Sequence, residues 1–203
     1  MLLERNDVNP DRADNSGRTP LSRAAGPADW LLYIDGQEEA VRILLERNDV
    51  NPDSADTSGR TPISWAAENG SARVLRMLLE RSDVNPDKAD ESGRTPLSRA
   101  AGPGFISRGT EEEREWAAKM LLERNDVNPD SADTSGRTPL SWAASDGSAG
   151  VLRMLLERND VNPDKADKSG RVPLSWMAVN KDEEIKGMLP ALRQNDTHPN
   201  TAD

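Results

Sequence analysis

The pentapeptide Ser-Gly-Arg-Thr-Pro recurs along this chain of 203 residues, and the recurrence constrains the fold more than any other feature. It occupies residues 16–20, 58–62, 92–96 and 135–139, and a diverged copy, Ser-Gly-Arg-Val-Pro, follows at 169–173. Successive glycines of the motif are 42, 34, 43 and 34 residues apart, so a period of 34 is lengthened twice, by 8 and by 9 residues. Repeats of this length form solenoids, in which the core lies between neighbouring units.

The most regular unit, residues 56–89, predicts two short helices joined by turns. The stretch 56–59 has turn chemistry, and Thr61-Pro62 predicts a helix start, with Thr as the N-cap and Pro at the first helical position. We expect this first helix to end at 69–71. A second helix is expected over 72–81, where apolar residues recur at helical spacing. A polar connector that contains proline then leads into the next unit.

The composition fits a solenoid and argues against several kinds of partner. Only 34% of the residues are hydrophobic and 3% aromatic, which is low for one deep core but sufficient for thin layers between units. The net charge of −10 argues against a nucleic acid, because nucleic acids are bound through clustered Lys and Arg. No apolar stretch is long enough to span a bilayer, so a membrane is not expected as a partner either.

Residues that could support catalysis or bind a metal are scarce. The chain has no cysteine, and its single histidine, His198, lies in the C-terminal tail. The acidic turn 49–53 lacks the glycine and the final glutamate of a calcium loop. The sequence therefore predicts a protein that is not an enzyme and has no metal or cofactor. The first residues lack the features of a signal peptide, which favours a cytoplasmic location.

The order of turn, helix, turn, helix and long connector resembles the ankyrin repeat. The family signature T-P-L is present at 19–21, 95–97 and 138–140, with single departures at Ile63 and Val172 in the other two copies. The paired leucines of the second helix also fit, at residues 44–45, 78–79, 121–122 and 155–156. The resemblance implies an all-α solenoid of five helix-turn-helix units after an N-terminal half repeat. The style of the array is similar to the ankyrin repeats of fungal NOD-like receptors.

The register of the repeat predicts one array over residues 1–190 and a disordered tail at 191–203. The two insertions, of 8 and 9 residues, fall between the helices of the first and third units. The predicted boundaries are a half repeat at 1–13 and full units at 14–55, 56–89, 90–132, 133–166 and 167–190.

Two departures from the ankyrin pattern need local substitutes. Serine replaces the histidine that usually follows T-P-L, so the hydrogen bonds of that histidine must be replaced or absent. The glycine that usually follows the second helix is also missing. Asn is the next best residue for a left-handed helix cap, and we expect that conformation at Asn48, Ser82, Asn125 and Asn159.

Positions that vary between copies, while the frame stays fixed, are the first candidates for partner binding. Ankyrin arrays usually hold partners with their finger turns and inner, first helices. The resemblance therefore implies contacts at the finger positions Asn15, Thr57, Glu91, Thr134 and Lys168, and at the inner-helix ends Glu68, Asn69, Ser145 and Asp146. For any one of these residues, neutral variation at an exposed site is an equally good explanation.

An arginine follows each repeat glycine and gives a second candidate set. Units about 10 Å apart would arrange these side chains as a ladder. These arginines either bind acidic side chains of a partner or each pairs locally with the aspartate four residues earlier. We favour local pairing, because surface arginines usually find a nearby carboxylate. The residues are Arg18, Arg60, Arg94, Arg137 and Arg171.

Aromatic residues supply the remaining candidates. The residue two positions after the T-P-L leucine is Arg in the units with insertions and Trp in the others, and Trp65 and Trp142 are either the edge of the core or binding contacts. The insertions contain Trp30, Tyr33 and Phe105. These three either form the walls of a groove or cover the tops of the repeats, and both interpretations stay open.

Together these features favour a non-enzymatic protein–protein interaction module that binds through finger turns and the concave face of the inner helices. We expect it to be the recognition region of a larger intracellular sensor or scaffold, with another protein as partner and with a monomeric state of its own. The alternative is a structural or self-associating array, in which the uncapped N-terminal end and the inserted loops mediate assembly.

Overall fold

The computed structural model describes residues 9–26, 34–102, 110–146, 148–179, 183 and 185–188, and these residues form helices and turns without any strand. The predicted all-α solenoid of helix-turn-helix units is confirmed. Its helices are α1 (Pro20–Ala25), α2 (Ile34–Leu45), α3 (Pro62–Asn69), α4 (Ala72–Leu79), α5 (Pro96–Ala101), α6 (Glu111–Leu122), α7 (Pro139–Asp146), α8 (Ala149–Leu156) and α9 (Pro173–Val179).

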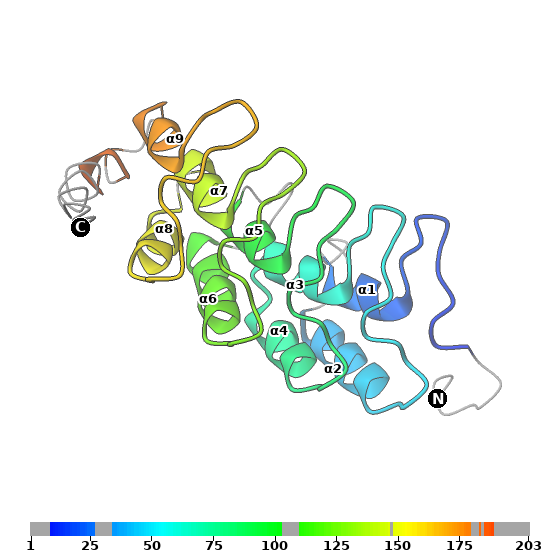
Figure 1. Cartoon of the computed structure of the whole chain (residues 1–203). Coiled ribbons are helices and arrows are strands. Elements are labelled where there is room, and N and C mark those ends of the chain that lie inside the picture. Colours follow the sequence, from blue (N-terminus) through cyan, green and yellow to red (C-terminus); the bar gives the residue numbers. More distant parts are fainter. Residues whose placement is uncertain are drawn as a thin grey trace.

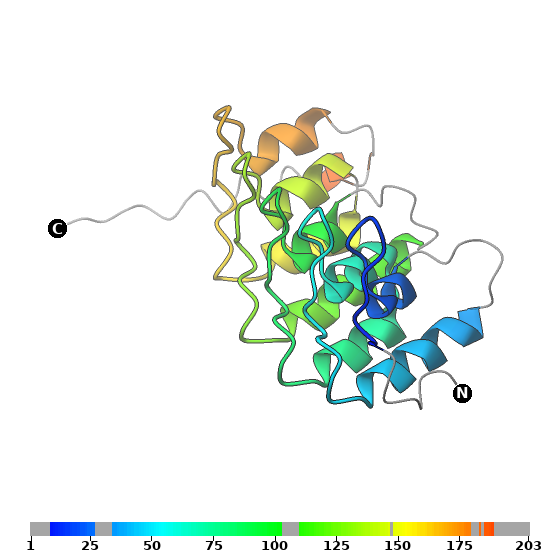
Figure 2. The same cartoon turned by 90° about the vertical axis from the view of Figure 1, so that its right-hand side faces the viewer.

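The units stack side by side in two helical layers (Figure 1). The first helices, α1, α3, α5, α7 and α9, form the inner layer, and the second helices, α2, α4, α6 and α8, form the outer one. Long turns project from the inner layer as a row of fingers. Figure 2 shows the fingers from the side, where they stand beside one another along the array.

Threonine caps start the inner helices, as the sequence predicts. Thr19, Thr61 and Thr95 have extended backbones and accept a hydrogen bond from the backbone N–H of the serine three residues later. The hydroxyl of that serine, which stands where the family has histidine, lies 3.1 to 3.3 Å from the threonine hydroxyl in the first four units. A buried Thr–Ser pair therefore takes the place of the histidine within the unit. The fifth unit has Val172 instead, and Ser175 is exposed.

The insertions lengthen the second helices. α2 and α6 each have 12 residues, whereas α4 and α8 each have 8. α6 begins with a capping box, in which Thr110 accepts from the backbone of Glu113 and the Glu113 side chain accepts from the backbone of Thr110. Part of each insertion therefore forms an additional turn of outer helix.

Thin apolar layers between the units form the core. Leu21, Ile63, Leu97 and Leu140 occupy the same place in four successive inner helices and are almost completely buried. The alanine pairs that follow them are buried as well, except for the partly buried Ala24, and their small side chains let neighbouring helices approach closely. This packing explains how a chain with so few aromatic residues builds a continuous core.

Main-chain hydrogen bonds join the fingers of neighbouring units. The backbone N–H of each finger position donates to the carbonyl of the motif serine in the preceding unit, at 2.8 to 3.0 Å; the donors are Thr57, Glu91, Thr134 and Lys168. The motif glycines have φ between 75° and 85°, a region that favours glycine. In the first four units, a Cβ on this glycine would lie 2.6 to 2.8 Å from the donating nitrogen, so glycine is required for the shape of the finger and for the approach of the next one.

The outer helices end differently from the sequence-based expectation. No residue other than glycine has a positive φ in the described parts of the chain, so the predicted left-handed caps at Asn48, Ser82, Asn125 and Asn159 are wrong. An arginine of the next unit closes α2, α4 and α6 instead. Its Nη1 donates to the carbonyl of the last helical residue, from Arg81 to Leu45 at 2.8 Å, from Arg124 to Leu79 at 3.1 Å and from Arg158 to Leu122 at 2.8 Å.

These capping arginines are held in place by carboxylates. Each one forms an ion pair of 2.6 to 2.7 Å with the aspartate two residues later, at Asp83, Asp126 and Asp160. The side-chain hydrogen bond from the arginine lowers the pKa of each of these aspartates. The outer helices α2, α4 and α6 are thus completed by a neighbouring unit, which removes the need for a glycine at their ends.

The role of the glycine can be tested by comparing two finger positions with the same φ of 77°, Gly93 and Gly170. A Cβ at Gly93 would lie 2.8 Å from the nitrogen of Thr134, whereas a Cβ at Gly170 would have nothing within 4 Å. We expect Gly170→Ala to cost only the strain of the left-handed backbone, about 1 to 2 kcal/mol. Gly93→Ala should cost more, because it also breaks the contact between units.

Urea unfolding followed by circular dichroism measures both losses. Equal destabilisation by the two substitutions would show that the hydrogen bonds between fingers contribute nothing to stability.

Candidate binding surface on the fingers and inner helices

An aspartate opens each finger and fixes its shape. In the third unit, Oδ1 of Asp90 accepts from the backbone N–H groups of Ser92 at 2.8 Å and Arg94 at 3.1 Å. The other oxygen, Oδ2, accepts from Nε of Arg99 on the inner helix at 2.8 Å. The same backbone pattern recurs at Asp14, Asp56, Asp133 and Asp167.

The Arg and Trp residues that alternate on the inner helices make the same contact, a hydrogen bond to the aspartate of their own finger. Nε1 of Trp65 donates to Oδ2 of Asp56 at 3.1 Å, and Nε1 of Trp142 donates to Asp133 at 3.0 Å. Both residue types therefore tie a finger to its helix. In the first unit, Nη1 of Arg23 lies 3.4 Å from Asp14. The backbone N–H of Arg18 is the main influence that lowers the pKa of Asp14.

The last unit departs from this arrangement. Nε of Arg171 donates to Oδ2 of Asp167 at 3.1 Å, in place of the tryptophan. Nε1 of Trp176 is buried without a hydrogen-bond partner. Burial raises the pKa of Asp167, but hydrogen bonds from the backbone of Arg171 and Ser169, together with the charge of Arg171, outweigh it, so the pKa lies below its ordinary value.

The motif arginines stack on the tryptophans. The guanidinium carbon lies 3.6 Å from the centre of the Trp142 ring for Arg137 and 3.9 Å for Arg94. Arg137 also lies 4.2 Å from Trp176, whose ring is 4.0 Å from Arg171. Arg94, Trp142, Arg137, Trp176 and Arg171 thus form one continuous stack of alternating cations and indoles across three units.

The ladder of arginines is consequently engaged inside the array. The expected local pairing with aspartate is present at Arg18, at 3.5 Å, and at Arg171. Arg94 and Arg137 instead donate through Nη2 to the carbonyls of Ser98 at 2.6 Å and Ser141 at 3.1 Å. Arg60 stacks on Trp65 at 4.2 Å. The guanidinium groups are part of the floor beneath the fingers.

The five finger positions have a different environment. Their backbone N–H groups make the hydrogen bonds between units from the second finger onwards, while their side chains are exposed. Thr57 adds a side-chain bond, since its Oγ1 also donates to the carbonyl of Ser16 at 3.0 Å. The other four side chains can change without altering the hydrogen bonds between the fingers. The residues are Asn15, Thr57, Glu91, Thr134 and Lys168.

A family model described as ankyrin repeats (3 copies) matches residues 30–107 and 106–203. The chain belongs to the ankyrin repeat family. A comparison with curated proteins gave no match. Ankyrin repeats are in general protein–protein interaction modules.

Glu68 does not belong to the exposed surface of this ankyrin array. It varies between copies and was therefore predicted to contact a partner, but only 3% of it is exposed. Its carboxylate lies 2.9 Å from Nη2 of Arg60 and 3.5 Å from Nη1 of Arg99, which are themselves largely buried. The carboxylate therefore separates two cations that face each other across a junction between units.

The corresponding position in the fourth unit of the array is Ser145, and the unit that follows it has Trp176 rather than Arg at the alternating position. No second cation needs neutralising there, because Arg137 stacks on Trp176. The variation from Glu68 to Ser145 therefore follows the identity of the next unit.

The other predicted contacts fall into two groups. Trp65, Trp142, Asn69 and Ser145 are half-buried at the edge of the inner layer, and Asn69 donates to the carbonyl of Trp65 at 2.8 Å. The remaining candidates lie outside the described residues; they are Trp30, Tyr33, Phe105 and the side chain of Asp146. Most of the predicted N-terminal half repeat and the whole predicted tail also lie outside the described residues.

Two tryptophans were missed as candidates. Trp176 completes the stack in the last unit, and its place in the Arg/Trp alternation was the available signal. Trp116 on α6 is 57% exposed and is the one large apolar side chain exposed among the described residues. The available signal for Trp116 was its position directly after the highly charged run 111–115.

Other kinds of site find no support in the described part of the array. Its carboxylates and other potential ligands form no group of three or more that could hold a metal ion. Within the same residues, no helix combines the length and the apolar character needed to cross a membrane.

The pairing of Glu68 with the next unit predicts a specific rescue. Glu68→Ser should leave Arg60 and Arg99 facing each other and cost about 3 kcal/mol of stability, the usual loss when one partner of a buried ion pair is removed. Adding Arg99→Trp recreates the junction of the fourth and fifth units and should recover most of that loss. The new indole can donate to Asp90, as Trp65 does to Asp56.

The free energies of unfolding of the two single variants and the double variant form a cycle that isolates the coupling. Simple addition of the two single effects would show that Glu68 and Arg99 are not coupled.

Proposed function

We propose that this ankyrin array is a non-enzymatic module that binds another protein through its finger tips and the adjoining edge of the inner helices. The observation that carries the proposal is that backbone groups and side chains have different roles in each finger. Backbone groups bond one finger to the next, with an added side-chain bond from Thr57 to Ser16, and one exposed side chain per unit is left to vary. A row of such positions, regularly spaced, suits an extended contact with a macromolecule.

The rigidity of the fingers supports this function. Each finger is closed by hydrogen bonds of 2.8 to 3.0 Å between the aspartate and the motif glycine and arginine, and is bonded to its neighbour. Side chains on such a frame lose little conformational entropy when a partner binds. The binding energy then depends on the side chains at the tips and not on ordering of the loops.

The contact set includes the half-buried floor below the fingers. Trp65, Trp142, Asn69 and Ser145 contribute their exposed edges, and the motif arginines contribute donors where their guanidinium groups reach solvent. Arg171 is the clearest of these, because half of its side chain is exposed while its partner Asp167 is buried. Trp30, Tyr33, Phe105 and Asp146 belong to the proposal on sequence grounds alone.

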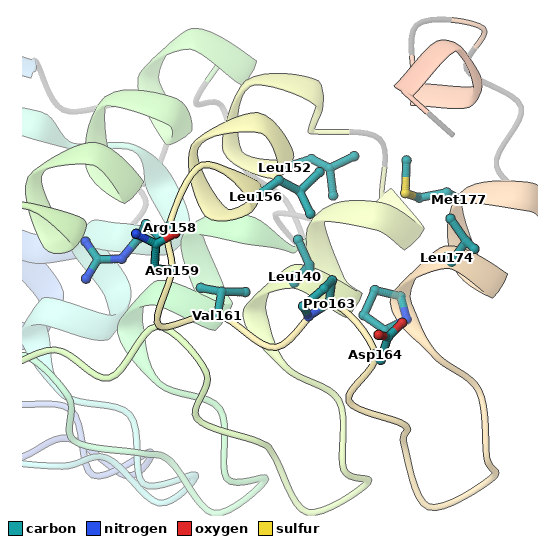
Figure 3. Close-up of a pocket in the computed structure, with 11 residues that line it drawn as sticks. Leu140, Leu152, Leu156, Arg158, Asn159, Val161, Pro163, Asp164, Leu174 and Met177 are labelled. Carbon is teal, nitrogen blue, oxygen red and sulfur yellow. The ribbon is translucent and has the colours of Figure 1, made fainter. Parts of the chain in front are cut away.

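The setting of the module is proposed on the same basis. The array is the recognition region of a larger cytoplasmic sensor or scaffold, similar in style to the arrays of fungal NOD-like receptors. Self-association is the second candidate function, and one observation favours it, a pocket of about 330 Å³ in the last layer of the array, whose lining includes Leu140, Leu152 and Leu174 (Figure 3).

The finger proposal is tested by capture of partners with two matched baits. The first bait carries alanine at the five exposed finger positions, Asn15, Thr57, Glu91, Thr134 and Lys168. Because these side chains are exposed, the substitutions should change stability little, by about 0.5 kcal/mol or less at each site. Quantitative mass spectrometry should show that the proteins captured by the natural chain are lost.

The matched control carries alanine at five exposed positions of the outer helices and their ends, and it should capture the same proteins as the natural chain. The substituted residues are Arg76, Glu80, Glu112, Glu123 and Glu157. If the control bait loses the partners and the finger bait keeps them, the binding surface is on the outer helices.

A further inference from the structure

The dipeptide Asn-Gly occurs once in the sequence, at the end of an inner helix. Asn69 is the last residue of α3, and Gly70 caps that helix with a left-handed backbone, φ 66°. Asparagine is a chemically labile residue. It is most labile before glycine, because glycine has no side chain to shield its backbone nitrogen from the neighbouring amide. The pair therefore introduces a possible covalent reaction at the edge of the inner layer.

The remaining asparagines are followed by larger residues. In the connectors they precede aspartate, as at Asn48, or proline, as at Asn51. Proline has no backbone N–H and cannot take part in the reaction. Asn15 of the first finger precedes Ser16, whose backbone N–H donates to Oδ1 of Asp14 at 2.8 Å. Asn69 is therefore the asparagine whose sequence context most favours loss of its amide.

The reaction is a substitution at the side-chain amide of Asn69. The backbone nitrogen of Gly70 loses its proton and forms a bond to Cγ of Asn69, while the bond from Cγ to Nδ2 breaks and ammonia leaves. Water then opens the resulting succinimide ring. Cleavage of the new bond gives aspartate, and cleavage of the original peptide bond gives isoaspartate, in which the main chain runs through Cγ. The net change consumes one water and releases one ammonia, without an oxidant or a reductant.

The fold holds both reacting groups in hydrogen bonds. The backbone N–H of Gly70 donates to the carbonyls of Ala66 and Ala67, the second at 3.3 Å. Nδ2 of Asn69, which is the leaving nitrogen, donates to the carbonyl of Trp65 at 2.8 Å. Both donors must be released before the nitrogen of Gly70 can bond to Cγ.

The third unit keeps this end of α3 closed. α6 packs against α3, and a Cβ on Gly70 would lie 2.7 Å from Cβ of Glu113 and 2.9 Å from the backbone nitrogen of Arg114. The residue before Asn69 is the buried Glu68, whose carboxylate lies 3.5 Å from Arg99 of the third unit. The end of α3 can therefore open only when the second and third units separate locally.

We propose that Asn69 is a site of spontaneous deamidation, and that opening of the junction between the second and third units controls its rate. While the junction is closed, the amide is retained. Each opening exposes the amide, so the fraction of converted chains measures how often this junction has opened. The inference does not depend on the finger surface as a binding site.

The products alter the junction that protects the site. Either product places a carboxylate beside Glu68 at the C-terminal end of α3, where the helix dipole disfavours a negative charge, and removes the donor to Trp65. The fourth unit has Asp146 at this position but Ser145 beside it, so only one carboxylate stands there. Isoaspartate also adds a carbon to the main chain, where Gly70 is already in tight contact with α6. We expect conversion to weaken the junction.

The natural chain tests the reaction when it is incubated at mildly alkaline pH, once folded and once in concentrated urea. Peptide mapping by mass spectrometry follows each asparagine, and chromatography separates aspartate from isoaspartate. In urea, Asn69 should convert faster than any other asparagine. In the folded chain its rate should be lower by at least about tenfold, because the reaction waits for the open state. Equal rates in the two states, or a faster reaction elsewhere in urea, would overturn the proposal.

Two variants test whether this junction controls the rate, with each rate divided by that of the same variant in urea. Glu68→Ser should raise the folded-state rate by at least about tenfold, since removal of one partner of a buried ion pair favours the open state. Gly93→Ala is the matched control, because it disturbs the junction between the third and fourth units, and it should raise the rate less. Equal effects of the two substitutions would reject control by this junction.

Low, non-denaturing urea gives a second measurement without any substitution, and it decides the question if a variant does not fold. A local opening exposes less surface than complete unfolding, so the deamidation rate should rise less steeply with urea than the population of unfolded chains. Equal dependence on urea would show that Asn69 reacts only in the fully unfolded chain, and the proposed local opening would be wrong.

Discussion

The array depends on one carboxylate in each unit, the aspartate that opens the finger. Its first oxygen accepts from two backbone N–H groups of the finger, and in the second, third and fourth units its second oxygen accepts from a Trp or Arg of the inner helix. The angle between finger and helix is therefore fixed within the unit. The hydrogen bonds between fingers, the stack of arginines and tryptophans and the row of exposed side chains all rely on that angle.

Polar contacts hold neighbouring units together at two opposite edges. The fingers bond through their backbones at one edge, and the arginine caps of the outer helices bond at the other. Between these edges, the inner helices of the first four units each contribute one leucine or isoleucine and a pair of alanines to a thin core. Because both edges are anchored, a chain with 34% hydrophobic residues maintains a regular stack.

Features set by neighbours in sequence were predictable, and features set by neighbours in space were not. The threonine caps, the helix order and the finger glycines follow from local chemistry. The left-handed caps were wrong because Arg81, Arg124 and Arg158 reach back from the next unit, across 36 to 45 residues. Glu68 was misplaced because variation between copies marks both exposed residues and buried residues that change with a partner.

The contact of Glu68 with Arg99 also constrains the order in which the units can follow one another. The residue at the end of an inner helix must suit the unit that comes next. Glutamate stands before the arginine unit, at Glu68, and glycine or serine stands before a tryptophan unit, at Gly26, Gly102 and Ser145. A single unit moved to a new place carries the wrong residue at one junction. Two adjacent units moved together keep their internal junction intact. Recombination within such a gene is therefore expected to conserve pairs, and the length of the array should grow in steps of two.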